Sequence, residues 1–332
     1  MKRILVIQTA SIGDVILATA VIEKLHNHYP DAKIDYLIKK GNEGLFKSHP
    51  FLNNILIWDK RNNKTANLIK ILFQIRKTKY DLVVNIQRFF SSGMLTALSG
   101  AGSTVGFKKN PLSMFFSKRF DHSIGMPGKK HLHEVERNQQ LIVDVTDKEY
   151  AKPRLYPTDN DYNSIAEHHN CRYICVAPAS LWYTKQYPKE EWCKMLNRDI
   201  PADIAIYMIG GPADIELCNH IMEHLPNHKT KNFAGKLSLL QSAALMKTAV
   251  MNYVCDSSPM HLCSSVDAPV VAIFCSTVPE FGFGPLSSNS TVIQSEKELQ
   301  CRPCGLHGHK QCPNGTFECA YSIMQTAKFP HI

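Results

Sequence analysis

Apolar and polar residues alternate along the chain in blocks that predict strands and helices in turn. Residues 3–7 contain the continuous apolar run 4–7, which is typical of a buried strand. After it, Ala18, Val21, Ile22 and Leu25 recur at helical spacing, and Pro30 ends the predicted helix. The same alternation continues through the first half, with strands predicted at 33–38, 55–58, 81–86 and 105–107 and helices around 68–75 and 131–145.

The periodicity is lost between residues 148 and 159, where two prolines stand, and this segment is the best linker candidate. A second series follows, with strands predicted at 173–179, 204–209, 249–255 and 269–275 and helices at 188–198, 214–225 and 239–248. Such alternation predicts parallel sheets with helices on both faces. The sequence therefore predicts two α/β domains, residues 1–150 and residues 151–332.

Two strand-to-helix turns carry residues suited to binding a phosphate. In the segment 256–261 a strand ends on an acid, two hydroxyls cap the next helix, and a proline opens it. The segment QTASIGD (8–14) forms a similar turn after the first strand. Helix starts of this kind present backbone N–H groups to a phosphate, beyond the carboxyl ends of the strands. Two such turns predict one ligand held in a cleft between two domains.

The composition excludes several classes of protein. A chain of 332 residues with 44% hydrophobic and 20% charged residues is expected to be a soluble globular protein with two full cores. No apolar run approaches the roughly 20 residues that a bilayer span requires. The basic start followed by an apolar run mimics a secretory signal, but Gln8, Thr9 and Asp14 interrupt it. We therefore expect a cytoplasmic protein that begins at Met1.

The net charge is +9, and basic residues crowd one part of the first half. Such a run either forms a solvated face or binds an anionic partner: nucleic acid, an acidic membrane surface or a phosphorylated substrate. Its members are Lys108, Lys109, Lys118, Arg119, Lys129, Lys130 and Arg137, with His122, His131 and His133 among them.

None of the eleven cysteines precedes Cys171, and in a cytoplasmic protein of this size we do not expect a disulfide framework. Several stand in predicted strands, where a free thiol behaves as a small hydrophobe. Near the end of the chain, Cys301, Cys304, Cys312 and Cys319 form a cluster that also contains two histidines. The cluster has the ligand types of a zinc site but not the spacing of a zinc ribbon. Its alternative role is that of reduced thiols that pin a terminal loop.

Three charged side chains are candidates for chemistry, each with a structural alternative. Asp14 either caps the first helix or acts as a general base on a hydroxyl. Lys185, with Ser180 near it, is either solvated or neutralises a diphosphate. Asp214 either caps a helix or bonds a ribose. No turn that holds these residues carries the Gly-x-Gly-x-x-Gly fingerprint, which disfavours a nicotinamide enzyme.

Five motifs in register resemble the lipopolysaccharide heptosyltransferases, a family of inverting glycosyltransferases. They are SIGDV (11–15), KQYPKEEW (185–192), GGP (210–212), AGKLSL (234–239) and the acid-hydroxyl-proline turn at 256–261, with HEVER (133–137) before the linker. The resemblance covers nearly the whole chain and extends to the cysteine-rich end. It implies the GT-B fold, in which two Rossmann-like domains face each other across a cleft. It also implies transfer of a heptose from ADP-heptose to an anionic lipopolysaccharide core, without a catalytic metal or cofactor.

The resemblance also implies roles for individual residues. Asp14 would deprotonate the acceptor hydroxyl, and the leaving diphosphate would be held by Lys185 and the backbone at the second turn. The residues implied to bind the donor are Ser180, Lys185, Asp214, Asp256, Ser257, Ser258 and His261. Those implied to bind the acceptor are Ser11, Gly13, Lys109 and Arg137. An acceptor of this kind places the enzyme against the inner face of the cytoplasmic membrane.

The chain departs from the family pattern at two places: Ser258 stands where many members have glycine, and FFSS (89–92) where many have a lysine. A related GT-B transferase with another nucleotide sugar or surface-glycan acceptor is therefore the alternative. Other classes are a nucleotide-binding protein without transferase activity, a basic zinc protein that binds nucleic acid, and a Rossmann oxidoreductase. No recognised nucleic-acid module accompanies the basic run, so we expect no nucleic-acid partner.

Overall fold

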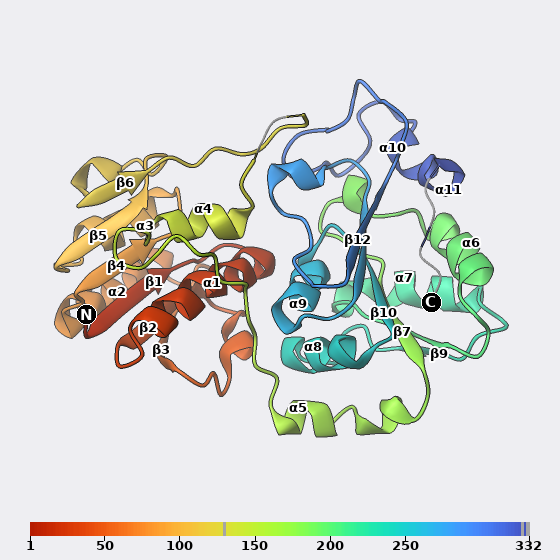
Figure 1. Cartoon of the computed structure of the whole chain (residues 1–332), viewed down its shortest axis with the longest axis horizontal. Helices are drawn as coiled ribbons and strands as arrows, with labels where there is room; N and C mark the ends of the chain where they lie inside the picture. Colours follow the sequence, from red (N-terminus) through yellow and green to blue (C-terminus); the bar gives the residue numbers. More distant parts are fainter. Residues whose placement is uncertain (129–130, 327–328, 330–332) are drawn as a thin grey trace. The chain divides into compact units, whose positions relative to one another are not determined.

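A computed structural model describes residues 1–128, 131–326 and 329, so that Lys129 and Lys130 of the basic run lie outside it. The chain divides into two compact units (Figure 1). Unit 1 comprises Met1–Ile124 and Leu132–Tyr156. Unit 2 comprises Pro157–Ile332 together with the described residues of Gly125–His131. Among the described residues, no helix has both the length and the apolar character that crossing a bilayer demands.

Unit 1 is built on a six-stranded parallel sheet with the strand order β3-β2-β1-β4-β5-β6. The order turns back between β1 and β4, and the loops after these strands leave the same edge of the sheet. Ligands of doubly wound sheets bind at such a switch point. The strands are β1 (Arg3–Ile7), β2 (Lys33–Lys39), β3 (Leu52–Trp58), β4 (Leu82–Asn85), β5 (Ser103–Phe107) and β6 (Lys118–Phe120).

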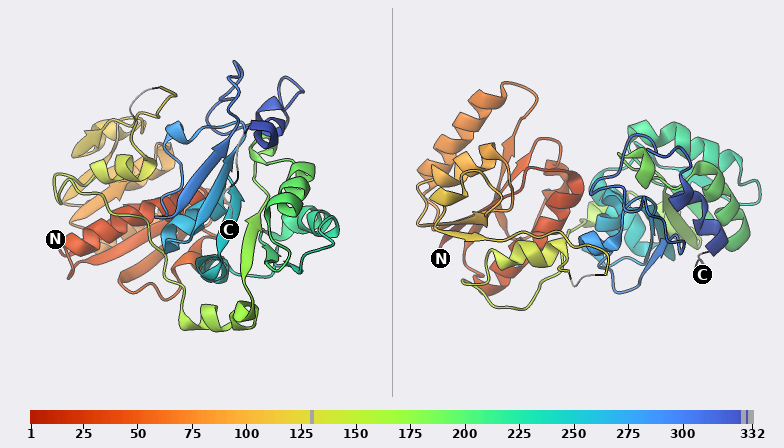
Figure 2. Two further views of the ribbon diagram at one scale, coloured as in Figure 1. Left: turned by 45° about the vertical axis from the view of Figure 1, so that its right-hand side comes forward. Right: turned by 90° about the horizontal axis from the view of Figure 1, so that it is seen from above.

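Helices cover both faces of this sheet (Figure 2). Alternate residues of a strand point to opposite faces, so Leu5 and Ile7 pack against the apolar stripe of α2, which includes Ile71 and Ile75. Helices α1 and α4 contact each other, as do α2 and α3. The helices of unit 1 are α1 (Ile12–His28), α2 (Lys64–Thr78), α3 (Phe90–Ala97) and α4 (Glu134–Gln140), with short 3₁₀ turns η1 (Glu43–Phe46) and η2 (Ser113–Phe115).

Unit 2 repeats the same architecture. Its parallel sheet, which we call sheet 2, has the order β12-β11-β10-β7-β8-β9, so its switch point lies between β7 and β10. The strands are β7 (Tyr173–Ala177), β8 (Ala205–Met208), β9 (Thr230–Asn232), β10 (Met251–Cys255), β11 (Val270–Phe274) and β12 (Ser290–Gln294). The prediction of two parallel α/β sheets with helices is therefore confirmed.

The end of the described chain belongs to the core of unit 2. Phe317, Cys319 and Ile323 pack with Trp192 of α6 against one face of the sheet, and the segment cannot leave without exposing this surface. The helices of unit 2 are α5 (Asp159–Asn163), α6 (Lys189–Asp199), α7 (Ile215–Glu223), α8 (Leu239–Thr248), α9 (Ser258–Val266), α10 (Glu318–Tyr321) and α11 (Ile323–Thr326). Further 3₁₀ turns are η3 (Ala166–Asn170), η4 (Tyr183–Lys185), η5 (Pro212–Asp214) and η6 (Pro279–Phe281).

The helix expected over residues 131–145 is shorter in the structure. Helix α4 ends at Gln140, and the chain continues as tight turns in which the N–H groups of Leu141 and Ile142 bond carbonyls three residues back. The β-branched residues that follow, Ile142, Val143 and Val145, lower helix propensity. The segment predicted as linker lies along unit 1 as far as Tyr156, whose hydroxyl donates to Glu23 of α1 at 2.9 Å.

Candidate active site

The switch point of sheet 2 holds an ion pair. Lys185 Nζ lies 2.7 Å from Asp256 Oδ2, and the two side chains are 16% and 7% exposed. Asp256 follows β10, Lys185 ends the 3₁₀ turn η4 in the loop after β7, and the two strands are neighbours in the sheet. The hydroxyl of Thr277, just beyond β11, donates to the same oxygen at 2.6 Å. Loops from three adjacent strands therefore fix one cation at the edge where doubly wound sheets commonly bind ligands.

The turn after Asp256 differs in one respect from its prediction. Ser257 is the N-cap residue of α9 and Pro259 stands in its first turn, but the Ser257 hydroxyl does not cap the helix. It donates instead to the carbonyls of Ala179, at 3.2 Å, and Cys255, at 3.4 Å. The hydroxyl thus ties the loop after β7 to the loop after β10. With no hydroxyl cap in place, the start of α9 keeps its attraction for an anion.

The cysteine-rich segment packs directly against this site. The N–H of Thr184 donates to the carbonyl of His309, and the Thr184 carbonyl accepts the N–H of Ser276. The Thr184 hydroxyl accepts the N–H of His309 at 2.8 Å and the hydroxyl of Ser276 at 3.0 Å. Gly308 has φ +75°, and a Cβ on it would lie 3.0 Å from both Lys185 Cγ and Thr184 Oγ1. A side chain at position 308 would therefore push on the lysine.

A second contact of this segment is made by Arg302. Its guanidinium donates to the carbonyls of Cys275 (2.7 Å) and Thr277 (2.8 Å) and to Gln294 Oε1 (2.7 Å). Burial lowers the pKa of Arg302, and the three acceptors offset the loss of water around its charge. The residue therefore pins the ends of β11 and β12 from outside the sheet.

The remaining expected donor residues lie on the same edge of sheet 2. Ser180 is partly buried in the loop after β7, and its carbonyl accepts the side chain of Gln186 at 2.7 Å. His261 is buried in the second turn of α9. Asp214, after β8, accepts the N–H of Gly211 at 2.7 Å. Of the two roles considered for Asp214, the geometry shows the cap.

In unit 1, Asp14 lies at the first turn of α1, after the end of β1. Its carboxylate accepts the Ser11 N–H at 3.2 Å and also bonds the Ser11 hydroxyl, which closes a capping box at the helix start. Gly13 between them is buried. The carboxylate is partly exposed, and a cap uses only part of its acceptor capacity. The structure thus shows the capping role, and the role of Asp14 as a base stays a prediction.

The loop after β4 supplies buried amides beside this turn. Gln87 Oε1 accepts the Thr9 hydroxyl at 2.7 Å, and Asn85 Oδ1 accepts the Gln87 N–H at 2.9 Å. The NH₂ groups of Asn85 and Gln87 are buried and have no hydrogen-bond partner among the described residues. Buried donors without partners are rare in folded proteins and indicate a ligand or water.

A cavity of about 430 Å³ lies at the carboxyl ends of β2 and β3. Lys60 lines it and donates to the Thr9 carbonyl at 2.7 Å, next to the Asp14 turn. Burial, with the charges of Lys39 and Lys64, lowers the pKa of Lys60 to about 8. Four basic side chains, Lys39, Lys40, Lys60 and Arg61, face two acidic ones, Glu43 and Asp59, so the cavity is suited to an anion.

The two basic residues expected to bind an acceptor have different environments. Lys109 is exposed just beyond β5 and makes no ion pair with another described residue. Arg137 is 1% exposed, and its guanidinium bonds Glu134 at 2.8 Å and the Leu132 carbonyl. A buried guanidinium that is already neutralised does not present its charge to a ligand. These contacts give Arg137 a structural role in unit 1, and its contact with an acceptor stays a prediction.

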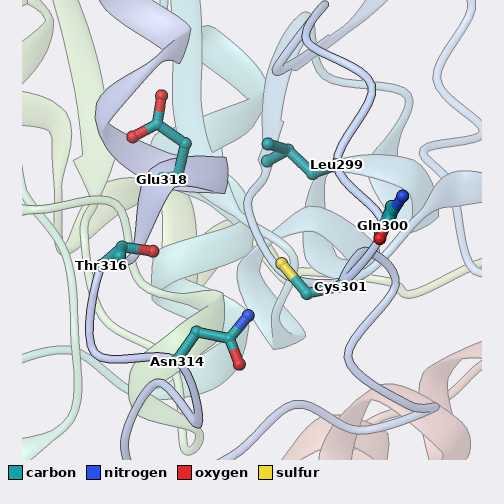
Figure 3. A pocket seen from close by; sticks show the side chains of 6 residues that line it. All are labelled: Leu299, Gln300, Cys301, Asn314, Thr316 and Glu318. Carbon is teal, nitrogen blue, oxygen red and sulfur yellow. The ribbon is translucent and has the colours of Figure 1, made fainter.

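The cysteine-rich segment contains a cavity of about 540 Å³, lined by Leu299, Gln300, Cys301, Asn314, Thr316 and Glu318 (Figure 3). It has a carboxylate and no basic side chain, so it does not suit a phosphate. All eleven cysteines are free. Within residues 1–128, 131–326 and 329, no group of three or more His, Cys, Asp or Glu side chains is placed to hold a metal ion.

Sequence reasoning missed the residues that hold the expected ones in place. Thr184, Thr277 and Arg302 surround the Lys185–Asp256 pair, and Gln87 and Lys60 flank the Asp14 turn. Thr277 and Gln87 could have been found, because each follows a predicted strand at the ligand-binding edge. Arg302 and the Gly308 loop gave no such signal, since their contacts lie far away in the sequence.

Comparison with known proteins assigns the chain to a family. Residues 68–316 match the profile of glycosyltransferase family 9 (heptosyltransferase). Lipopolysaccharide heptosyltransferase 3 of Escherichia coli is 24% identical over 294 residues, which cover 83% of this chain and 84% of the relative. Sequence and fold can therefore be compared over most of both chains.

Two solved structures share the fold. The glycosyl transferase family 9 protein of Veillonella parvula superposes with a TM-score of 0.78 and 23% identity, covering 88% of this chain and 85% of that one. The E. coli heptosyltransferase WaaC, solved with ADP, superposes with a TM-score of 0.68 and 21% sequence identity. The match covers 87% of this chain and 92% of WaaC. The same enzyme has been solved with ADP-2-deoxy-2-fluoro heptose. Both structures share the GT-B fold with its two Rossmann-like units, and the chain belongs to glycosyltransferase family 9, the heptosyltransferases.

Proposed function

We propose that the protein transfers a heptose from ADP-heptose to an anionic inner-core acceptor of lipopolysaccharide, with inversion at the anomeric carbon and without a metal. The ion pair between Lys185 and Asp256 carries the proposal. It places one nearly buried cation beside the start of α9, at the switch point of sheet 2. A helix N-terminus and a fixed ammonium together suit the diphosphate of a nucleotide sugar. ADP bound to WaaC supports this choice of nucleotide.

In this proposal unit 2 binds the donor. The backbone at Ser257 and Ser258 and the ammonium of Lys185 hold the diphosphate, while Asp256 keeps the lysine in place. Ser180, Asp214 and His261 lie on the same sheet edge and complete the donor site. As the bond from the anomeric carbon to the diphosphate breaks, negative charge develops on the leaving oxygen. Charges that are fixed before the reaction stabilise this oxygen without reorganisation.

Unit 1 provides the base and binds the acceptor. Asp14 takes the proton of the acceptor hydroxyl, whose oxygen then attacks the anomeric carbon from the face opposite the diphosphate. Ser11 and Gly13 shape the turn that presents this carboxylate. Lys109 and the basic cavity around Lys60 bind carboxylates or phosphates of the acceptor. The acceptor is a glycolipid, so the enzyme works in the cytoplasm against the inner face of the membrane.

Isothermal titration with ADP-heptose, ADP, UDP and NAD, without added metal, tests the donor. We expect ADP and ADP-heptose to bind and NAD not to bind. A preference for UDP would retain the fold and the mechanism but replace the sugar, which is the alternative of a related GT-B transferase. If none of the four binds, unit 2 is not a nucleotide-sugar site and the proposal fails.

A further inference from the structure

Unit 1 exposes four large apolar side chains in two neighbouring segments. Phe89 and Phe90, at the start of α3, are 52% and 60% exposed, and Met114 and Phe115, in η2, are 70% and 64% exposed. We call these four residues the apolar patch. Single exposed apolar side chains are normal on protein surfaces, whereas a group of them marks an interaction site.

The backbone beneath the apolar patch is held firmly by Asn110. Its side-chain NH₂ donates to the carbonyl of Phe89 at 3.0 Å, and its Oδ1 accepts the N–H of Leu112 at 3.0 Å. Helix α3 meets this loop at Gly93, where a Cβ would lie 2.2 Å from Asn110 Oδ1. The two segments are thus joined at close range, and their exposed side chains project from a fixed base.

The surroundings of the apolar patch are basic. Residues 82–120 contain no Asp or Glu, but they contain the basic residues Arg88, Lys108, Lys109, Lys118 and Arg119. Lys108 pairs with Asp121 and Lys118 with Asp144. Arg88, Lys109 and Arg119 have no ion pair among the described residues, and the Arg88 guanidinium lies 5.7 Å from the Phe89 ring. Apolar side chains within a basic surround are typical of surfaces that bind anionic lipids.

The apolar patch lies on the same sheet edge as the proposed base. The Thr9 hydroxyl, in the turn before Asp14, bonds the side chain of Gln87, and the Gln87 carbonyl accepts Asn110 Nδ2 at 3.0 Å. The same Asn110 Nδ2 also bonds Phe89. A short hydrogen-bonded path therefore connects the Asp14 turn to the apolar patch. An acceptor anchored in a membrane would reach Asp14 from this side.

We propose that the apolar patch docks unit 1 on an anionic phospholipid bilayer. The aromatic and thioether side chains enter the interface, and Arg88 and Arg119 bind lipid phosphates. The biological meaning of the surface rests on the proposed glycolipid acceptor, but lipid binding itself does not. A second copy of the chain fits less well, because two such surfaces would bring like charges together. Single-stranded nucleic acid, the other anion that stacks on aromatic rings, gains nothing from Met114.

Sedimentation with vesicles tests the proposal on the whole chain. The vesicles are phosphatidylcholine alone or phosphatidylcholine mixed with phosphatidylglycerol. We expect the protein to sediment with the mixed vesicles only, and less so as salt is raised. The triple variant Phe90→Ser, Met114→Ser, Phe115→Ser should lose about tenfold or more in vesicle affinity. Phe73→Ser, which removes a 68% exposed ring from α2, is the matched control and should bind as the wild type does.

Three results would overturn the proposal. The first is vesicle binding by the triple variant equal to that of the wild type. The second is a triple variant that no longer binds a single-stranded oligonucleotide but still binds vesicles. The third is a concentration-dependent dimer of the wild type that the variant lacks and that does not bind vesicles.

Failure of the proposed function can be told apart from failure of docking. Transfer of heptose to a deacylated, water-soluble acceptor should be the same in the wild type and the triple variant. If no acceptor is used by either protein while vesicle binding still depends on the apolar patch, the transferase proposal fails and the docking surface stands. If transfer is normal and vesicles are not bound, the docking proposal fails alone.

Discussion

Lys185 Nζ and Asp256 Oδ2 lie 2.7 Å apart at the carboxyl edge of sheet 2, with both side chains nearly buried. Removing one partner of such a buried ion pair lowers stability, because the remaining charge is left without compensation. Lys185→Ala should lower donor affinity about 10- to 100-fold, reduce kcat and destabilise the fold by about 1–3 kcal/mol. Titration with ADP and denaturant unfolding measure these effects. Unchanged kinetics would remove Lys185 from the diphosphate site.

Asp14→Asn separates the base from the cap. Asparagine keeps a side-chain oxygen that can accept the Ser11 N–H, so the capping box should survive and the melting temperature should change little. Transfer should fall by about 10²- to 10⁴-fold, since a neutral amide cannot take the acceptor proton. Donor affinity should stay at the wild-type level. Turnover like that of the wild type would show that Asp14 is a cap only.

Gly308→Ala tests whether the cysteine-rich segment positions Lys185. The new methyl group would lie 3.0 Å from Lys185 Cγ, so we expect about a tenfold loss of donor affinity. Gly315→Ala is a matched control, because Gly315 has φ +72° and a Cβ there would meet nothing within 4 Å. Both variants carry the same backbone strain of about 1 kcal/mol. Equal losses of donor affinity in the two would contradict a positioning role.

Lys109 and Arg137 should separate acceptor binding from stability. Lys109→Met removes an exposed cation and should raise the KM for the acceptor without changing the melting temperature. Arg137→Met leaves His122 as the remaining ion-pair partner of the buried Glu134. The free energy of unfolding should fall by about 3–5 kcal/mol. Its KM for the acceptor, measured well below its melting temperature, should be unchanged. A raised KM for Arg137→Met alone would return Arg137 to the acceptor site.

Glu23 makes the stability of unit 1 depend on pH. Burial raises the pKa of Glu23 to about 7, although the Tyr156 hydroxyl and the charge of Arg154 act to lower it. The folded state therefore holds this proton more tightly than the unfolded chain does. The stabilisation is complete below pH 4.5, where both states are protonated, and is lost as the pH rises through 7. The total change is about 3 kcal/mol.

Glu23→Gln should remove this dependence and unfold at a higher denaturant concentration than the wild type at pH 8. Glu216→Gln, at an exposed glutamate of α7, is the matched control and should leave the pH profile unchanged. Urea unfolding from pH 4.5 to pH 8 provides the measurement. Parallel profiles for the wild type and Glu23→Gln would rule out a linkage through Glu23.

The fold could be predicted from the sequence because its strands are buried on both faces. Segments composed mainly of apolar residues, such as 3–7 and 251–255, identify β1 and β10 directly. Two three-residue edge strands escaped prediction: β6 reads Lys-Arg-Phe, and β9 reads Thr-Lys-Asn. Edge strands are half exposed and short, so their sequences lack the apolar signal. Their place was set by pairing with β5 and β8 rather than by their own composition.

Candidate site residues could be predicted from the sequence only where a charged side chain stands in a strand-to-helix loop. Asp14, Lys185 and Asp256 each stand in a strand-to-helix loop, and such loops meet at one edge of a parallel sheet. The pairing of Arg137 with Glu134 could not be predicted, because a run of basic residues in sequence does not show which of them the fold buries against an acid. Thr184 and Gly308 are far apart in the sequence, and only the folded chain brings them together.

The contact between Thr184 and His309 has a consequence for how the protein is made. Residues 184 and 185 leave the ribosome long before residues 302–309, which close against them. Until these later residues are synthesised, Lys185 lacks the outer support that Gly308 and Thr184 give it. If Lys185 holds the diphosphate as proposed, newly made chains gain nucleotide affinity only in the last stage of synthesis. A premature stop before codon 302 removes this support together with the core residues Phe317, Cys319 and Ile323.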